Sequence, residues 1–165
     1  MTPTDREPFN QRADVFRTER FLSVEPLSGY ISFHYEDSGF VIYLVADAND
    51  LELGAALLQA LDRSRFVWPY DEPELFDWQR NHRCYRNWQQ QVMRLYGYKS
   101  KRELHKRLDW CRVERSQGKI TLQPHRRHKP GYFDDLPKER DLVIPETRDA
   151  VIVGAALRTA LDRCE

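Results

Sequence analysis

Two segments of the chain repeat the same amphipathic helical pattern. LGAALLQALDRSR, which begins at Leu53, matches VGAALRTALDRCE, which begins at Val153, at most positions. In both segments apolar residues recur at positions i, i+4, i+7 and i+8, which is the spacing of one helical face. A short apolar run precedes each segment, at residues 41–46 and 142–144. The pattern therefore predicts one strand–turn–helix unit that is used twice within one domain.

Each repeated helix carries a glycine followed by two alanines, at Gly54 and at Gly154. Glycine in a helix interior costs about 1 kcal/mol relative to alanine, so we expect it where a helix must approach its sheet closely. Neither glycine belongs to a G-x-G-x-x-G or G-K-[ST] motif, so a phosphate-binding turn is the weaker interpretation.

A longer helix is predicted between the two repeats. From residue 76 to residue 96, aromatic and aliphatic residues recur mostly every three or four positions, and Gly97 follows at the place of a C-terminal cap. Ser100 and Glu103 have the spacing of a capping box and predict the start of a short basic helix. The buried stripe of this second helix is expected to consist of Leu104, Leu108 and Cys111.

Short apolar runs separated by glycine and proline predict the strands. Two of them flank SQGK, residues 116–119, which has the composition of a hairpin loop. The chain is therefore expected to form an α+β fold, with a five- to six-stranded mixed or mainly antiparallel sheet packed with about four helices and one strand–helix element repeated. The predicted strands are residues 21–24, 30–35, 41–46, 113–115, 120–122 and 142–144.

The chain of 165 residues has the length of one ordinary domain. Residues 1–20 alternate acids and arginines, and we expect a loosely ordered N-terminal segment there. Residues 21–165 are expected to form the single domain.

Composition and the first residues indicate the compartment. The longest apolar run, residues 40–46, is far shorter than the roughly 20 residues that cross a bilayer, and the start of the chain has no apolar region of a secretory signal. The cysteines contain no C-x-x-C pair, which favours buried thiols in a reducing compartment. We therefore expect a cytoplasmic protein with no membrane partner. The cysteines are Cys84, Cys111 and Cys164.

The net charge is zero, but the charges are segregated along the chain. Residues 94–129 contain twelve lysines or arginines and three acids. Tyr96 and Tyr98 lie within this basic tract, so nucleic-acid binding by phosphate contact and stacking is one interpretation, and a solvated helix face is the other. Two acidic clusters balance the tract. They are Asp71, Glu72, Glu74 and Asp77, and Asp134, Asp135, Glu139 and Asp141.

Residue patterns that would indicate catalysis are missing from the sequence. His125 and His128 form the closest histidine pair, but neither a cysteine nor a carboxylate stands at ligand spacing, and the neighbouring arginines would repel a cation. The sequence has no G-x-S-x-G, no H-E-x-x-H and no glycine-rich phosphate loop. We therefore predict no catalytic residue, no metal site and no cofactor, and favour a binding protein over an enzyme.

Four segments of the chain stand out by their order and sequence. They are ELGAALLQALDRSRF (52–66), YGYKSKREL (96–104), CRVERSQGKITLQP (111–124) and GAALRTALDRC (154–164). In this order they resemble the immunity proteins of bacterial contact-dependent growth inhibition (CDI) systems. The resemblance implies a small cytoplasmic protein that is not an enzyme, and that binds and neutralises the C-terminal toxin domain, often a nuclease, of a surface adhesin from a neighbouring cell. In some complexes of the family a toxin hairpin pairs with the sheet of the immunity protein.

A nuclease partner would present a basic substrate-binding surface, so we expect the contact at acidic residues that lie beside aromatic ones. The alternative is that these acids only solvate a loop and balance the basic tract. A second expected contact is the hairpin of residues 112–124, or the neighbouring sheet edge, through β-augmentation. The first candidate loop contains Trp68, Tyr70, Asp71, Glu72, Glu74 and Asp77, and the next candidate contains Tyr132, Phe133, Asp134 and Asp135.

Overall fold

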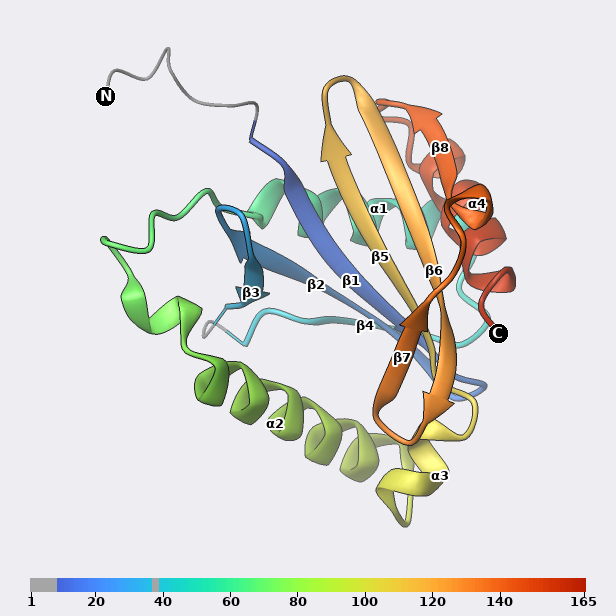
Figure 1. Cartoon of the computed structure of the whole chain (residues 1–165). Helices are drawn as coiled ribbons and strands as arrows, with labels where there is room; N and C mark the ends of the chain where they lie inside the picture. Colours follow the sequence, from blue (N-terminus) through green and yellow to red (C-terminus); the bar gives the residue numbers. More distant parts are fainter. Residues whose placement is uncertain (1–8, 37–38) are drawn as a thin grey trace.

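A computed structural model describes residues 9–36 and 39–165. Within these residues the chain forms an eight-stranded sheet and four α-helices (Figure 1). The strands are β1 (Gln11–Arg17), β2 (Phe21–Gly29), β3 (Phe33–Tyr35), β4 (Ile42–Val45), β5 (Asp109–Ser116), β6 (Lys119–Lys129), β7 (Tyr132–Asp135) and β8 (Leu142–Pro145). The helices are α1 (Asp50–Arg63), α2 (Trp78–Tyr96), α3 (Lys101–His105) and α4 (Ala150–Asp162), with short 3₁₀ turns η2 (Pro73–Phe76) and η3 (Lys138–Arg140).

The sheet runs in the order β3-β2-β1-β5-β6-β7, and every pairing between its strands is antiparallel. β4 extends the sheet beside the first half of β2, and β8 does the same beside the first half of β6. This architecture confirms the α+β fold with a mainly antiparallel sheet. The sheet has two more strands than the six predicted, because β1 and β7 were not recognised as strands in the sequence.

The expectation of a loosely ordered segment up to residue 20 is wrong for the described residues. β1 lies in the middle of the sheet, between β2 and β5. Its alternation places Ala13 and Val15 in one core and Phe16 in the other. The sequence does not reveal this alternation, because Asp14 has the character of a surface residue. In the structure its carboxylate is fully buried beside the guanidinium of Arg112. Residues 1–8 lie outside the described part.

Helices cover both faces of the sheet, and each face has its own hydrophobic core (Figure 1). On one face α1 and α4 pack side by side on apolar residues of β1, β2, β5 and β6. On the other face α2 and α3 cover a mainly aromatic core that includes Phe16, Phe21, Trp88 and Tyr98. The second face is only partly covered, and the candidate site described below lies there.

The two repeated helices meet through their glycines. A Cβ atom on Gly54 would lie 1.6 Å from the carbonyl oxygen of Ala150, and one on Gly154 would lie 1.7 Å from that of Asp50. The contact is reciprocal, since each glycine faces the first turn of the other helix. The sequence analysis correctly predicted that each glycine permits close packing. Each repeated helix, however, packs closely against the other helix and not against the sheet.

Other local predictions are confirmed by the helix and turn geometry. Gly97 ends α2 in the left-handed conformation, at φ +73°, and Ser100 caps α3 by accepting from the amide of Glu103. The β5–β6 turn has Gln117 and Gly118 at φ +51° and +73°, as a two-residue hairpin turn of type I′ requires. α3 ends at His105, so Cys111 belongs to β5 and not to the predicted helical stripe.

No helix of the described residues combines the length and the apolar character that a membrane span requires.

Replacing Gly54 or Gly154 with alanine is expected to destabilise the fold. The added Cβ cannot fit against a backbone oxygen, so the helices must separate, and overpacking of this kind costs about 1–3 kcal/mol even after the gain in helix propensity. Urea unfolding followed by circular dichroism measures the loss. Ala155→Ser, which adds an atom to the exposed neighbour of Gly154, is the control and should stay within about 0.5 kcal/mol of wild type. Wild-type stability of both glycine variants would contradict the packing argument.

Candidate functional site

A cleft of about 260 Å³ opens on the face of the sheet that carries α2. We call it the aromatic cleft, because rings from five elements line it. Trp110 of β5 contacts Phe133 of β7 with ring centroids 5.3 Å apart, and Phe16 of β1 lies under both α2 and Trp110. The lining residues are Phe16, Tyr35, Tyr85, Trp110, Gly131, Tyr132 and Phe133.

An ion pair with a buried carboxylate supports the aromatic cleft from the sheet. Arg112 Nε donates to Asp14 Oδ1 at 2.9 Å, and Arg112 Nη2 donates to Asp14 Oδ2 at 3.2 Å. The Tyr35 hydroxyl donates to Asp14 Oδ2 at 3.4 Å. The carboxylate of Asp14 raises the pKa of Arg112, and burial raises the pKa of Tyr35 well above its usual value. These groups fix the position of Tyr35 at the wall of the cleft.

Glu25 is a second acid in this layer, and it lies directly opposite Asp14 in the β1–β2 register. Only 9% of Glu25 is exposed, and within the described residues it makes no ion pair. Burial, and then the charge of Asp14, raise the pKa of Glu25 well above its usual value. The carboxyl of Glu25 therefore favours its protonated form.

His105 connects α3 to the aromatic cleft. Its Nδ1 donates to the carbonyl oxygen of Lys101 at 2.7 Å, so its Nε2 is left to accept from the Tyr85 hydroxyl at 3.1 Å and from the Gln89 amide at 3.0 Å. Burial lowers the pKa of His105, in agreement with this neutral form. The arrangement holds Tyr85 in place in the wall of the cleft.

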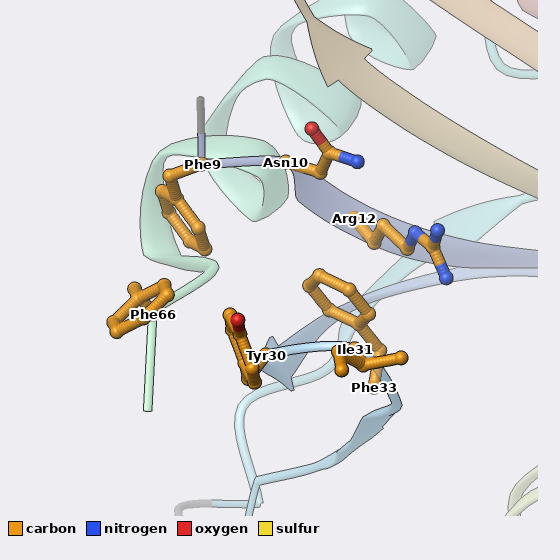
Figure 2. A pocket seen from close by; sticks show the side chains of 7 residues that line it. All are labelled: Phe9, Asn10, Arg12, Tyr30, Ile31, Phe33 and Phe66. Carbon is orange, nitrogen blue, oxygen red and sulfur yellow. The ribbon is translucent and has the colours of Figure 1, made fainter. Parts of the chain in front are cut away.

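A second concavity, of about 230 Å³, lies at another end of the molecule beside the first predicted contact loop. We call it the end pocket. In Figure 2 the rings of Phe9, Tyr30 and Phe66 face a common space. Trp68 packs on Tyr30 and Phe66 with ring centroids 4.7 and 5.0 Å apart, so the predicted loop continues from this pocket. Its lining residues are Phe9, Asn10, Arg12, Tyr30, Ile31, Phe33 and Phe66.

The four acids of the first predicted loop have different roles. Glu72 forms an ion pair with Arg65 at 2.9 Å, which lowers its pKa. Asp77 caps α2 by accepting from the amide of Gln79 at 3.0 Å. The side chains that remain available for a partner are those of Tyr70, which is 90% exposed, and of the exposed Asp71 and Glu74.

The second predicted group forms β7 and reaches the aromatic cleft. Tyr132 and Phe133 line the cleft, and Tyr132 is 61% exposed. Asp134 Oδ2 lies 2.8 Å from Nδ1 of His128, and Asp135 Oδ1 lies 3.4 Å from Nε2 of His125.

The two predicted groups do not come together. The first loop leads into the N-terminus of α2, whereas the β6–β7 turn lies beside α3, beyond the C-terminus of α2 (Figure 1). A helix of 19 residues is roughly 28 Å long. The sequence analysis missed Tyr35, Tyr85 and Trp110, which come from three separate elements and are brought together only by the tertiary fold.

Groups suited to metal or nucleophilic chemistry do not gather at either concavity. Among residues 9–36 and 39–165, no three His, Cys, Asp or Glu side chains are arranged to hold a metal ion. His125 stacks on Trp110 with ring centroids 3.7 Å apart. Burial raises the pKa of the Cys111 thiol well above its usual value and that of Cys164 to about 11, which keeps both thiols protonated.

Comparison with known proteins finds a family model and a relative that match the chain. A family model described as CDI immunity protein matches residues 11–164. The chain is 31% identical over 167 residues to the immunity protein CdiI-YPIII of Yersinia pseudotuberculosis serotype O:3 (strain YPIII), covering 93% of this chain and 94% of that relative.

Two solved structures share the fold. A protein of unknown function from Neisseria meningitidis matches with a TM-score of 0.88 and 27% identity, and covers 100% of both chains. A chain of the CdiA-CT/CdiI toxin and immunity complex from Yersinia pseudotuberculosis matches with a TM-score of 0.87 and 26% identity, over 96% of this chain and 100% of that one.

The raised pKa of Glu25 predicts a specific pH dependence of stability. Over the interval between its unfolded value, near 4.5, and its higher folded value, the folded state holds more protons than the unfolded state. Stability that is complete below the unfolded value is therefore lost as pH rises through this interval. Glu25→Gln replaces the protonated carboxyl with a neutral group of similar shape and should remove this loss.

Urea unfolding between pH 4 and pH 8 measures the effect. Glu25→Gln should match wild type at pH 4 and gain stability over it steadily as pH rises. Glu139→Gln, which removes an exposed carboxylate, should follow the wild-type curve. A constant difference between Glu25→Gln and wild type at every pH would show that Glu25 titrates normally.

Proposed function

Because the chain belongs to the CDI immunity protein family, we propose that it binds and neutralises the C-terminal toxin domain of a CdiA protein. The observation that carries this function is the match of the whole fold to a chain from a toxin and immunity complex. Neutralisation occurs by stoichiometric binding in the cytoplasm of the protected cell and not by catalysis. The toxin is a nuclease, as in many systems that the sequence motifs resemble.

We propose the aromatic cleft and the adjacent edge of β7 as the main contact surface. The hairpin of residues 112–124 is not an edge, because β5 pairs with β1 and β6, and β6 pairs with β5, β7 and β8. In the described residues, the free edges belong to β3 and β4 on one side of the sheet and to β7 and β8 on the other. Of these four strands, β7 contributes the most side chains to the aromatic cleft, through Tyr132 and Phe133. A toxin strand added to β7 would form main-chain hydrogen bonds there and place its side chains in the cleft.

The loop that contains Asp71 and Glu74 is proposed as a separate, electrostatic contact. Its two exposed carboxylates and the exposed ring of Tyr70 have the charge and the aromatic character that suit a basic nuclease surface. Glu72 and Asp77 serve the fold instead, through Arg65 and the start of α2.

Co-expression with a toxin domain tests the function directly. Cells that express the CdiA C-terminal domain encoded beside this chain should grow when the chain is present and arrest when it is absent. The purified pair should form a complex of equal stoichiometry. Growth arrest despite soluble expression of the chain, with no complex in size-exclusion chromatography, would refute the proposal.

Removal of the two exposed charges of the loop should slow association with the toxin. Asp71→Asn with Glu74→Gln leaves the ion pair of Glu72 and the cap of Asp77 intact, so the fold is preserved. Because charges at an interface rim act mainly on the encounter, we expect an association rate about threefold to tenfold lower at low salt and little change in dissociation. The control, Asp47→Asn with Glu139→Gln, removes the same charge from exposed positions elsewhere. Equal association rates for both double variants would exclude the loop from the interface.

A further inference from the structure

A basic groove of about 330 Å³ lies between α3 and the β6–β7 turn. It belongs to the basic tract of the sequence, and the proposed toxin contact does not yet account for it. Its walls come from two short segments that the fold brings together. The lining residues are Arg102, His105, Lys106, Arg127, His128, Lys129 and Pro130.

Several cations of the basic groove have no acidic partner. In the described part of the chain, the exposed side chains of Arg102 and Lys106 make neither an ion pair nor a hydrogen bond. The ammonium of Lys129 lies over the ring of Tyr132, 4.5 Å from its centroid, and meets no carboxylate. By contrast, Arg127 pairs with Asp109 and His128 pairs with Asp134. The groove therefore keeps a positive charge that the chain itself does not neutralise.

The basic groove and the aromatic cleft are adjacent. His105 lines the groove, and it hydrogen-bonds Tyr85, which lines the cleft. Pro130 lines the groove and its neighbour Gly131 lines the cleft. A Cβ atom on Gly131 would lie 3.8 Å from Nε2 of His105, so Gly131 lies beside the histidine that joins the two concavities. A polypeptide that fills the cleft can continue across Gly131 into the groove.

We propose that the basic groove binds a carboxylate-rich segment of the toxin that leaves the aromatic cleft across Gly131. This inference rests on the proposed function and adds the chemistry of the partner at one end of the same site. Arg102 and Lys106 pair with its aspartate or glutamate side chains, and Lys129 adds a third cation. The toxin surface is therefore acidic at this end, in contrast to the basic surface expected at the loop of Asp71 and Glu74.

A polypeptide suits the surface better than a nucleic acid does. Binding of single-stranded nucleic acid without sequence preference uses open aromatic faces on which bases stack. Tyr96 stacks on Phe21 with ring centroids 4.6 Å apart. Tyr98 is only 6% exposed, and its hydroxyl donates to Thr18 Oγ1 at 2.6 Å. The tyrosines that suggested stacking are thus used within the fold.

The test compares two double charge reversals that leave every ion pair among residues 9–36 and 39–165 in place. Arg102→Glu with Lys106→Glu changes the groove, and Arg83→Glu with Arg86→Glu makes the same change on exposed positions of α2. The probe is the catalytically inactive CdiA C-terminal domain encoded beside this chain. Its affinity for wild type and both variants is measured by calorimetry from low to high salt, after thermal melting has shown that the variants fold.

We expect the groove variant to bind the toxin at least tenfold more weakly than wild type at low salt and to lose much of the salt dependence of binding. The α2 variant should stay within about twofold of wild type. Reversing single acidic residues of the toxin to lysine should restore binding to the groove variant at one or more positions, which identifies the acidic segment.

Three other results would overturn the inference. Wild-type affinity of the groove variant would show that no acidic segment binds there, while the proposed function would stand. Failure of wild type itself to bind the toxin would refute the proposed function, and the inference with it. Loss of binding to a single-stranded RNA or DNA oligonucleotide, with toxin affinity unchanged, would assign the groove to nucleic acid.

Discussion

The close contact between α1 and α4 determines how the rest of the fold is arranged. Two copies of one strand–helix unit meet where Gly54 and Gly154 each leave room for a backbone oxygen of the other helix. This contact covers one face of the sheet, with the apolar sides of both helices on β1, β2, β5 and β6. The strands of the two units, β4 and β8, then extend opposite sides of the sheet. The proposed binding surfaces therefore lie on the other face and at the ends of the sheet.

On the other face, a fixed ion pair in the sheet lies beneath the open aromatic cleft. Asp14 and Arg112 join β1 and β5 below the aromatic cleft, and removing Arg112 would leave the buried carboxylate of Asp14 without its partner, a loss of about 3–5 kcal/mol. Above them the rings of Trp110 and Phe133 remain accessible from the solvent side. A surface of this kind changes little on binding, so less conformational entropy is lost when a partner binds.

The sequence predicts the local features of this fold well and its long-range features poorly. The repeated helices, the cap at Gly97 and the β5–β6 turn depend on residues that are close in sequence. β1 was missed because Asp14 reads as a surface residue until its partner, 98 positions away, is known. The aromatic cleft was missed for the same reason, since Tyr35, Tyr85 and Trp110 belong to three distant segments. Of the predicted contact residues, Tyr132 and Phe133 reach the cleft, and the signal that pointed to them was their place beside the acidic Asp134 and Asp135.

The separation of the acidic loop and the basic groove has an evolutionary consequence. They lie near opposite ends of α2, far beyond the distance of about 7–10 Å within which substitutions usually influence one another. The contributions that we propose for them in toxin binding should therefore add, so that each could diverge while the other still holds the partner. A lineage could then change the residues of one contact before those of the other, and every intermediate protein would still bind the toxin and protect its host.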